Sequence, residues 1–150
     1  MFHVKHSLEE ALKELGIEYT DEFPEKIEVY LTTLLNWNRR INLVSRRLSK
    51  QQILEKLLIP SLIPYNILYT DDRIMDFGAG AGISSIPLIL LCENREFTLV
   101  ESGVKPVTFL RNIRGELNLD YSIVHKYVKK AEDLPGTFKT AIVRAIDPES

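Results

Sequence analysis

The fold is decided by one glycine-punctuated stretch, Asp76-Phe77-Gly78-Ala79-Gly80-Ala81-Gly82. It follows a short apolar run that is typical of a strand and precedes an apolar segment, residues 83–92, that is typical of a helix. Glycines at alternate positions let the backbone turn sharply and let a ligand approach without a Cβ in the way. The N-terminus of the following helix presents free N–H groups. The stretch therefore predicts a loop that binds a nucleoside cofactor.

A second acid, Glu101, ends the next predicted strand and lies 19 residues beyond Gly82. Its carboxylate can accept hydrogen bonds from both ribose hydroxyls of a nucleoside. A dinucleotide fingerprint would need its third glycine at Ile83 and would not require Asp76, so the spacing argues against NAD. A tight strand-to-helix turn without a ligand stays open as the alternative.

Downstream of the loop, short apolar runs alternate with helically spaced segments. Strands are predicted at 74–76, 97–101, 122–124 and 141–143, with helices at 83–92 and 104–117 between the first three. This alternation predicts a parallel, doubly wound α/β sheet.

Upstream of the loop, the first 70 residues are predicted to be helical. Ser7 with Glu10 and Ser49 with Gln52 match the capping-box pattern, which predicts the starts of two helices. A longer helix is expected from about Pro24, and its apolar stripe consists of Ile27, Tyr30, Leu31, Leu34, Leu35 and Ile41. We expect a single domain, with a helical extension at 1–70 and a cofactor-binding α/β core at 71–150 whose C-terminal strands are missing.

Composition sets broad limits on function. The chain has 150 residues, 45% of them hydrophobic, which suits one compact domain. The net charge of −2 indicates no overall attraction for nucleic acid, so basic function must be local. Cys92 is the only cysteine, which favours a reducing compartment, and no apolar run approaches the ~20 residues that span a bilayer. A cytoplasmic protein without a metal site is expected, with a monomer favoured.

A local basic cluster lies in the helical extension, with only Glu55 to offset it. Its members are Arg39, Arg40, Arg46, Arg47, Lys50 and Lys56. The cluster is a candidate phosphate-facing patch for RNA, and the alternative is a set of solvated helix ends. Trp37 is predicted to be a packing anchor rather than a base-stacking platform.

The sequence also resembles a known family along nearly its whole length. The similar positions are Leu35-Asn36-Trp37-Asn38, Asn42-Leu43, Ser45, Ile74, the loop glycines, Ile86-Pro87-Leu88, Leu99, Glu101-Ser102, Lys105, Phe109-Leu110-Arg111, Ala131-Glu132-Asp133 and Arg144-Ala145. In these blocks the chain resembles the glucose-inhibited division protein B family. Members of this family are bacterial methyltransferases that modify N7 of a guanine in 16S ribosomal RNA. The chain ends soon after the last block, which suggests a truncated or divergent member.

The resemblance implies a Rossmann-like S-adenosylmethionine-dependent methyltransferase sheet with an N-terminal helical extension, and 16S ribosomal RNA or the small ribosomal subunit as partner. The cofactor-binding candidates are Asp76, Gly78, Ala79, Gly80, Gly82, Glu101, Ser102, Ala131 and Glu132. The candidates for the target pocket are Lys105 and Arg144, and those for RNA are Arg39, Arg40, Arg46, Arg47 and Lys130. A salt bridge at the sheet edge stays open as another role for Arg144.

Several positions depart from the family's pattern. The loop has Ala81 and Ser84-Ser85 where a proline and a glycine stretch are usual, and Pro106 follows Lys105 in place of a basic residue. A histidine, an aspartate and a serine that usually precede the sheet are Leu57, Pro60 and Ser61 here. Two rival functions therefore stay open, a catalytically silent RNA-binding or ribosome-assembly module and a small-molecule methyltransferase.

Overall fold

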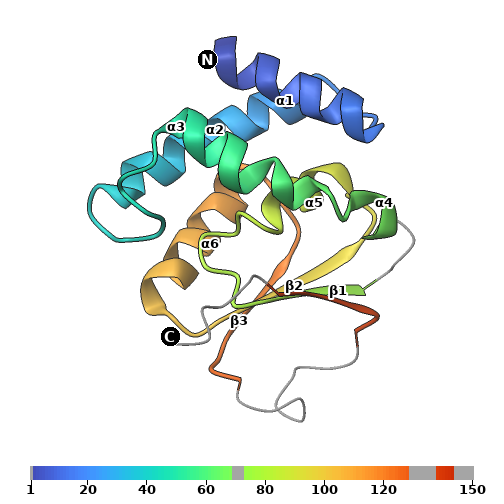
Figure 1. The fold of residues 1–150 in the computed structure, drawn as a ribbon. Coiled ribbons are helices and arrows are strands. Elements are labelled where there is room, and N and C mark those ends of the chain that lie inside the picture. Colours follow the sequence, from blue (N-terminus) through green and yellow to red (C-terminus); the bar gives the residue numbers. More distant parts are fainter. Residues whose placement is uncertain (1, 69–72, 129–137, 144–150) are drawn as a thin grey trace.

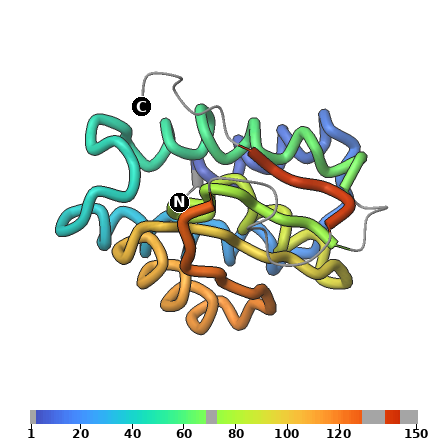
Figure 2. Tube along the Cα trace, turned by 90° about the horizontal axis from the view of Figure 1, so that it is seen from below, coloured from blue at the N-terminus to red at the C-terminus, as the bar shows by residue number. Residues whose placement is uncertain are grey.

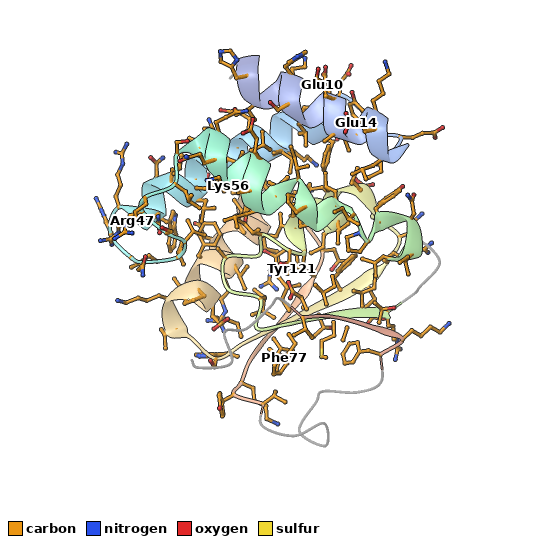
Figure 3. All side chains as sticks on the ribbon, viewed as in Figure 1. Glu10, Glu14, Arg47, Lys56, Phe77 and Tyr121 are labelled. Atoms are coloured by element: carbon orange, nitrogen blue, oxygen red, sulfur yellow. The ribbon has the colours of Figure 1, made fainter. Side chains whose placement is uncertain are left out.

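The computed structural model describes residues 2–68, 73–128 and 138–143. In this part of the chain a layer of helices covers one face of a parallel four-stranded sheet (Figure 1). Phe77, half-buried at the end of β1 (Arg73–Phe77), lies on the side of the sheet away from these helices (Figure 3). The arrangement confirms the predicted α/β class with an N-terminal helical extension.

The helical extension consists of two long helices followed by a series of short helical segments. Its elements are α1 (Phe2–Leu15), α2 (Glu22–Asn38), α3 (Lys50–Ile53), a π-helical turn η1 (Leu54–Leu58), a 3-10 turn η2 (Pro60–Leu62) and α4 (Tyr65–Leu68). The capping box of Ser49 and Gln52 is present in both directions and begins α3, as predicted. Pro60 has no N–H for a continuing helix, and the chain tightens there into the 3-10 turn.

The predicted start of the first helix at Ser7 is wrong. The helix begins at Phe2, because Val4 extends the buried stripe of Leu8 and Leu12 by one turn. The Ser7 hydroxyl does not cap a helix but accepts a hydrogen bond from Gln51 Nε2 at 2.9 Å.

The predicted apolar stripe of α2 also includes one residue that is not part of the helix. The helix ends at Asn38, so Ile41 lies beyond it. The Asn38 side-chain oxygen accepts hydrogen bonds from the backbone N–H groups of Leu43 and Val44, at 2.8 and 3.1 Å. This buried amide therefore turns the chain away from the helix axis.

The sheet follows the predicted alternation. The remaining elements are α5 (Ile86–Leu91), β2 (Glu96–Glu101), α6 (Val104–Glu116), β3 (Ser122–His125) and β4 (Thr140–Val143). Among the described strands all pairings are parallel, and the strand order is β3-β2-β1-β4. The order reverses at β1, and ligands of open α/β sheets bind outside the carboxyl ends of the strands at such a point.

One hydrophobic core joins the helical extension to the sheet. The Tyr30 ring on α2 is fully buried, with its centroid 6.2 Å from that of Phe109 on α6. Its hydroxyl donates a 2.6 Å hydrogen bond to the carbonyl oxygen of Ala81, in the loop after β1. Trp37 meets the same Phe109 ring edge-on at 5.5 Å, so it packs on α6 while the rest of this half-buried ring lines the surface.

The described ranges hold neither a membrane-spanning helix nor a metal cluster. No helix there is long and apolar enough to cross a membrane. No group of three or more histidine, cysteine, aspartate or glutamate residues is placed there to hold a metal ion.

We expect Tyr30→Phe to lower the free energy of unfolding by about 1–3 kcal/mol, because the buried Ala81 carbonyl would lose its donor. Urea unfolding measures the effect. Tyr19→Phe is the matched control: its side chain is 37% exposed, and removing its hydroxyl should change stability by less than about 0.5 kcal/mol. Equal losses in the two variants would contradict a structural role for the hydrogen bond.

Candidate functional site

The loop after β1 is fastened to the neighbouring strand by its backbone. The N–H groups of Gly78 and Ala79 both donate to the Val100 carbonyl on β2, at 2.9 and 3.0 Å. Gly78, Gly80 and Gly82 all have positive φ angles, of 70°, 55° and 79°. Side chains disfavour this left-handed backbone, which explains the alternate glycines.

The three glycines differ in what surrounds them. A Cβ added at Gly78 or Gly80 would meet no heavy atom within 4 Å. A Cβ added at Gly82 would lie 2.5 Å from Ile86 Cδ1 and 3.0 Å from Leu110 Cδ2. Gly82 is therefore required for close packing of the loop on α5 and α6, whereas Gly78 and Gly80 border open space that a ligand can fill.

Two carboxylates stand at the carboxyl ends of the central strands. Asp76 on β1 is buried, with 1% of its surface exposed, and Glu101 ends β2 half-buried. Glu101 Oε1 accepts from the Gly80 N–H at 2.9 Å, and its Oε2 accepts from the Gly103 N–H at 2.6 Å. Each carboxylate oxygen has a second lone pair, so Glu101 can hold the loop and still accept a hydrogen bond from a ligand.

Other candidates lie at the same edge of the sheet. Ser102 is exposed directly after β2, and Lys105 is exposed in the first turn of α6. The Ser102 carbonyl accepts a hydrogen bond from His125 Nε2 at 3.0 Å, which ties the end of β3 to this loop. No local sequence pattern around His125 signals this contact, because its partner lies 23 residues away in the chain.

The remaining candidates from the last third of the chain lie outside the described residues. They are Lys130, Ala131, Glu132 and Arg144.

The members of the basic cluster differ in how their side chains interact with the rest of the fold. Arg39, Arg40, Arg46 and Arg47 are exposed on the loop that joins α2 to α3, and Arg47 extends outward from it (Figure 3). The Arg46 Nε donates to the Asn38 carbonyl at 3.0 Å. Lys50 is ion-paired with Glu28 on α2 and also donates to the Thr32 hydroxyl, so its charge is largely compensated within the fold.

Figures 1 and 2 place this arginine loop, residues 39–48, on the side of the molecule toward which β1 and β2 run. The candidate RNA patch and the candidate cofactor loop therefore share one side of the fold. Asn38, whose side chain shapes the arginine loop, stands out in the sequence only as part of a resemblance. Its burial next to exposed arginines is what identifies it as a positioning residue.

Cys92 is a buried free cysteine. Burial raises the pKa of its thiol and outweighs the opposing effect of nearby Arg95. The side chain thus stays a neutral thiol near pH 7.

A comparison with protein families matches residues 24–149 to the GidB family, described as rRNA small subunit methyltransferase G. Proteins named ribosomal RNA small subunit methyltransferase G are similar to the chain. The Streptococcus thermophilus protein is 36% identical over 126 residues, 82% of this chain and 52% of the relative. The Macrococcus caseolyticus protein is 40% identical over 110 residues, 72% of this chain and 46% of the relative.

The chain spans about half the length of the curated relatives it matches. Among solved structures, the SAH-bound Podospora anserina methyltransferase PaMTH1 has a similar fold, with a TM-score of 0.52 and 14% identity over 85% of this chain and 59% of that one. The family match covers most of the chain, including the glycine loop and the arginine loop. The chain therefore belongs to the GidB family of rRNA small subunit methyltransferase G proteins.

Proposed function

We propose that this chain carries the cofactor-binding part of an S-adenosylmethionine-dependent methyltransferase that methylates N7 of a guanine in 16S ribosomal RNA. The observation that carries the proposal is the glycine loop held by Glu101 at the carboxyl ends of the two central strands. Membership of the GidB family supports the reaction and the substrate. The same substrate supports a cytoplasmic location.

The residues at this edge fit the proposed cofactor. The space beside the Cα atoms of Gly78 and Gly80, where other residues carry a Cβ, is open and leaves room for a nucleoside. Glu101 can accept from ribose hydroxyls with the lone pairs that the backbone N–H groups leave unused. The full proposed set is Asp76, Gly78, Ala79, Gly80, Gly82, Glu101 and Ser102, with Ala131 and Glu132 beyond the described residues.

When bound, S-adenosylmethionine supplies a methyl group on a positively charged sulfur. Guanine N7 has an exposed lone pair and loses no proton when it attacks a methyl group, so the chain need not provide a general base. Its task is to align the reacting atoms and to exclude water, effects worth roughly 7–11 kcal/mol of a barrier. Lys105 and Arg144 are the proposed residues for orienting the guanine or a neighbouring phosphate.

We propose that the arginine loop contacts the RNA backbone. Arg39, Arg40, Arg46 and Arg47 are all exposed, and the loop lies on the cofactor side of the fold (Figure 2). Lys130 is a further proposed contact. Guanidinium groups bind phosphates in a bidentate manner, which suits them to this role.

A mass-resolved methylation assay tests the proposal, with 16S RNA offered both naked and in the small subunit. We expect a mass increase of one methyl group on a guanine of one of these substrates. Binding of both S-adenosylmethionine and RNA without any transfer would instead favour the RNA-binding or ribosome-assembly module. Transfer to a small molecule alone would favour the other rival.

We expect Glu101→Ala to weaken S-adenosylmethionine binding by about 1–3 kcal/mol in calorimetry, because the ribose loses a charged acceptor and the Gly80 N–H loses its anchor. Glu96→Ala is the matched control at the opposite end of β2. Glu96 is exposed and pairs with Arg73 at the surface, so its removal should leave the affinity unchanged. An unaltered affinity in Glu101→Ala would place the ribose elsewhere.

Gly80→Ala and Gly82→Ala should distinguish a glycine that leaves room for the ligand from one that is needed for packing of the loop. Both force alanine into a left-handed backbone, at about 1–2 kcal/mol each. Gly82→Ala should lose a further ~1–3 kcal/mol of stability against Ile86 and Leu110. Of the two variants, Gly80→Ala should have the higher free energy of unfolding. Its affinity for the cofactor should nevertheless fall by about tenfold or more, which corresponds to roughly 1.4 kcal/mol. Full affinity in Gly80→Ala would refute the loop assignment.

Replacing Arg39, Arg40 and Arg47 together by glutamine should weaken RNA binding and flatten its salt dependence. Each phosphate that the protein no longer neutralises lowers the slope of log affinity against log salt by about 0.7–0.9. Affinity for the cofactor, which has no phosphate, should be unchanged and serves as an internal control. A wild-type salt slope would show that RNA docks on another face.

A further inference from the structure

A hollow of about 520 Å³ opens where α2 ends and the arginine loop begins. It is lined by Asn36, Trp37, Arg39, Arg40 and Ile41. Its wall thus combines an indole ring and an aliphatic side chain with two guanidinium groups. Flat aromatic surface next to positive charge is the combination that binds a nucleobase together with its phosphate.

The Trp37 ring is held in place before any ligand arrives. It is half-buried, and its edge-on contact with Phe109, at 76° between the ring planes, fixes it against a fully buried residue. The backbone N–H groups of Arg40 and Ile41 both donate to the Trp37 carbonyl at 3.0 Å, so the chain is folded tightly at this point. A ring fixed in this way loses little entropy when a base stacks on it.

The charge around the hollow favours an anion. Residues 29–54 contain five arginines and lysines and no acid. Within the described ranges Arg39 and Arg40 make no ion pair, whereas Lys50 is already paired with Glu28. The Asn38 side chain holds the backbone of Leu43 and Val44 in the loop that follows, and both arginines line the hollow at the start of this loop.

We propose that this hollow binds one unpaired nucleotide of the substrate RNA, with its base against Trp37 and its phosphate on Arg39 and Arg40. The inference rests on the proposed action on RNA and adds that the bound segment is single-stranded at this position. Bases inside a duplex are stacked on their neighbours and present no free face to an indole. The hollow would therefore select loops, bulges or ends of the RNA.

Trp37 is the only tryptophan of the chain, so its fluorescence reports on this site alone. The test titrates the full chain with a single-stranded hexa-adenylate, with an RNA duplex of equal charge, and with polyphosphate, which has the charge without bases. We expect saturable quenching with the single strand and little change with the duplex or polyphosphate, because a stacked base quenches the indole and neither control offers a free base to stack.

Two substitutions test the stacking surface by anisotropy of the labelled single strand. Trp37→Leu should weaken binding by about tenfold, the order of one base–aromatic stack. Trp37→Phe keeps a ring toward both Phe109 and the hollow and should restore most of the affinity. The thermal stability of both variants is measured alongside their affinity for the single strand. If affinity falls in proportion to the loss of stability, whether or not position 37 has an aromatic ring, the inference is overturned.

Charge is tested separately with a matched pair. Arg39→Gln with Arg40→Gln should reduce quenching by the single strand, whereas Lys5→Gln with Lys13→Gln, which removes two exposed charges from α1, should not. Equal effects of the two pairs would overturn the proposed phosphate contacts.

The remaining outcomes distinguish this inference from the proposed function. RNA binding and methylation with unchanged Trp37 emission would refute the nucleotide site and leave the proposed function standing. Equal quenching by polyphosphate would show a site for charge alone and would also refute it. Absence of both RNA binding and methylation would refute the two together.

Discussion

The hydrogen bond from the Tyr30 hydroxyl to the Ala81 carbonyl joins parts of the chain that are 51 residues apart in sequence. Left-handed glycines allow the loop after β1 to turn, but they do not choose one position for it. Its position is fixed from two sides, by Tyr30 from the helical layer and by Glu101 from the neighbouring strand. The helical extension is thus part of the structure that shapes the candidate cofactor site.

Glu101 has a structural role that is compatible with its proposed role in ligand binding. Its two oxygens accept from Gly80 and Gly103, so the carboxylate closes the loop onto β2 whether or not a ribose is present. A carboxylate has about four acceptor positions, and two backbone donors leave room for two hydroxyls. In the proposed complex the same carboxylate would align both the loop and the sugar, which would couple ligand binding to loop geometry.

Sequence patterns predicted what depends on near neighbours, namely the strands, the capping box of Ser49 and the loop glycines. They missed what depends on distant partners. The ion pair of Lys50 with Glu28 takes one member from the predicted basic patch, and no local pattern reports a partner 22 residues away. The unexpected first turn of α1 has the same origin, because Val4 is buried only once the core has formed.

Helix α2 connects the two candidate sites through side chains seven residues apart. Tyr30 meets the cofactor loop and Trp37 lines the hollow, about 10 Å farther along the helix axis. Both rings pack on Phe109 of α6, so the helix is held on the sheet at both points. A change that loosens α2 would therefore disturb both candidate sites together, whereas a change confined to the glycine loop or to the arginines would disturb one alone. The pattern of effects across such variants separates defects of the scaffold from defects of a site.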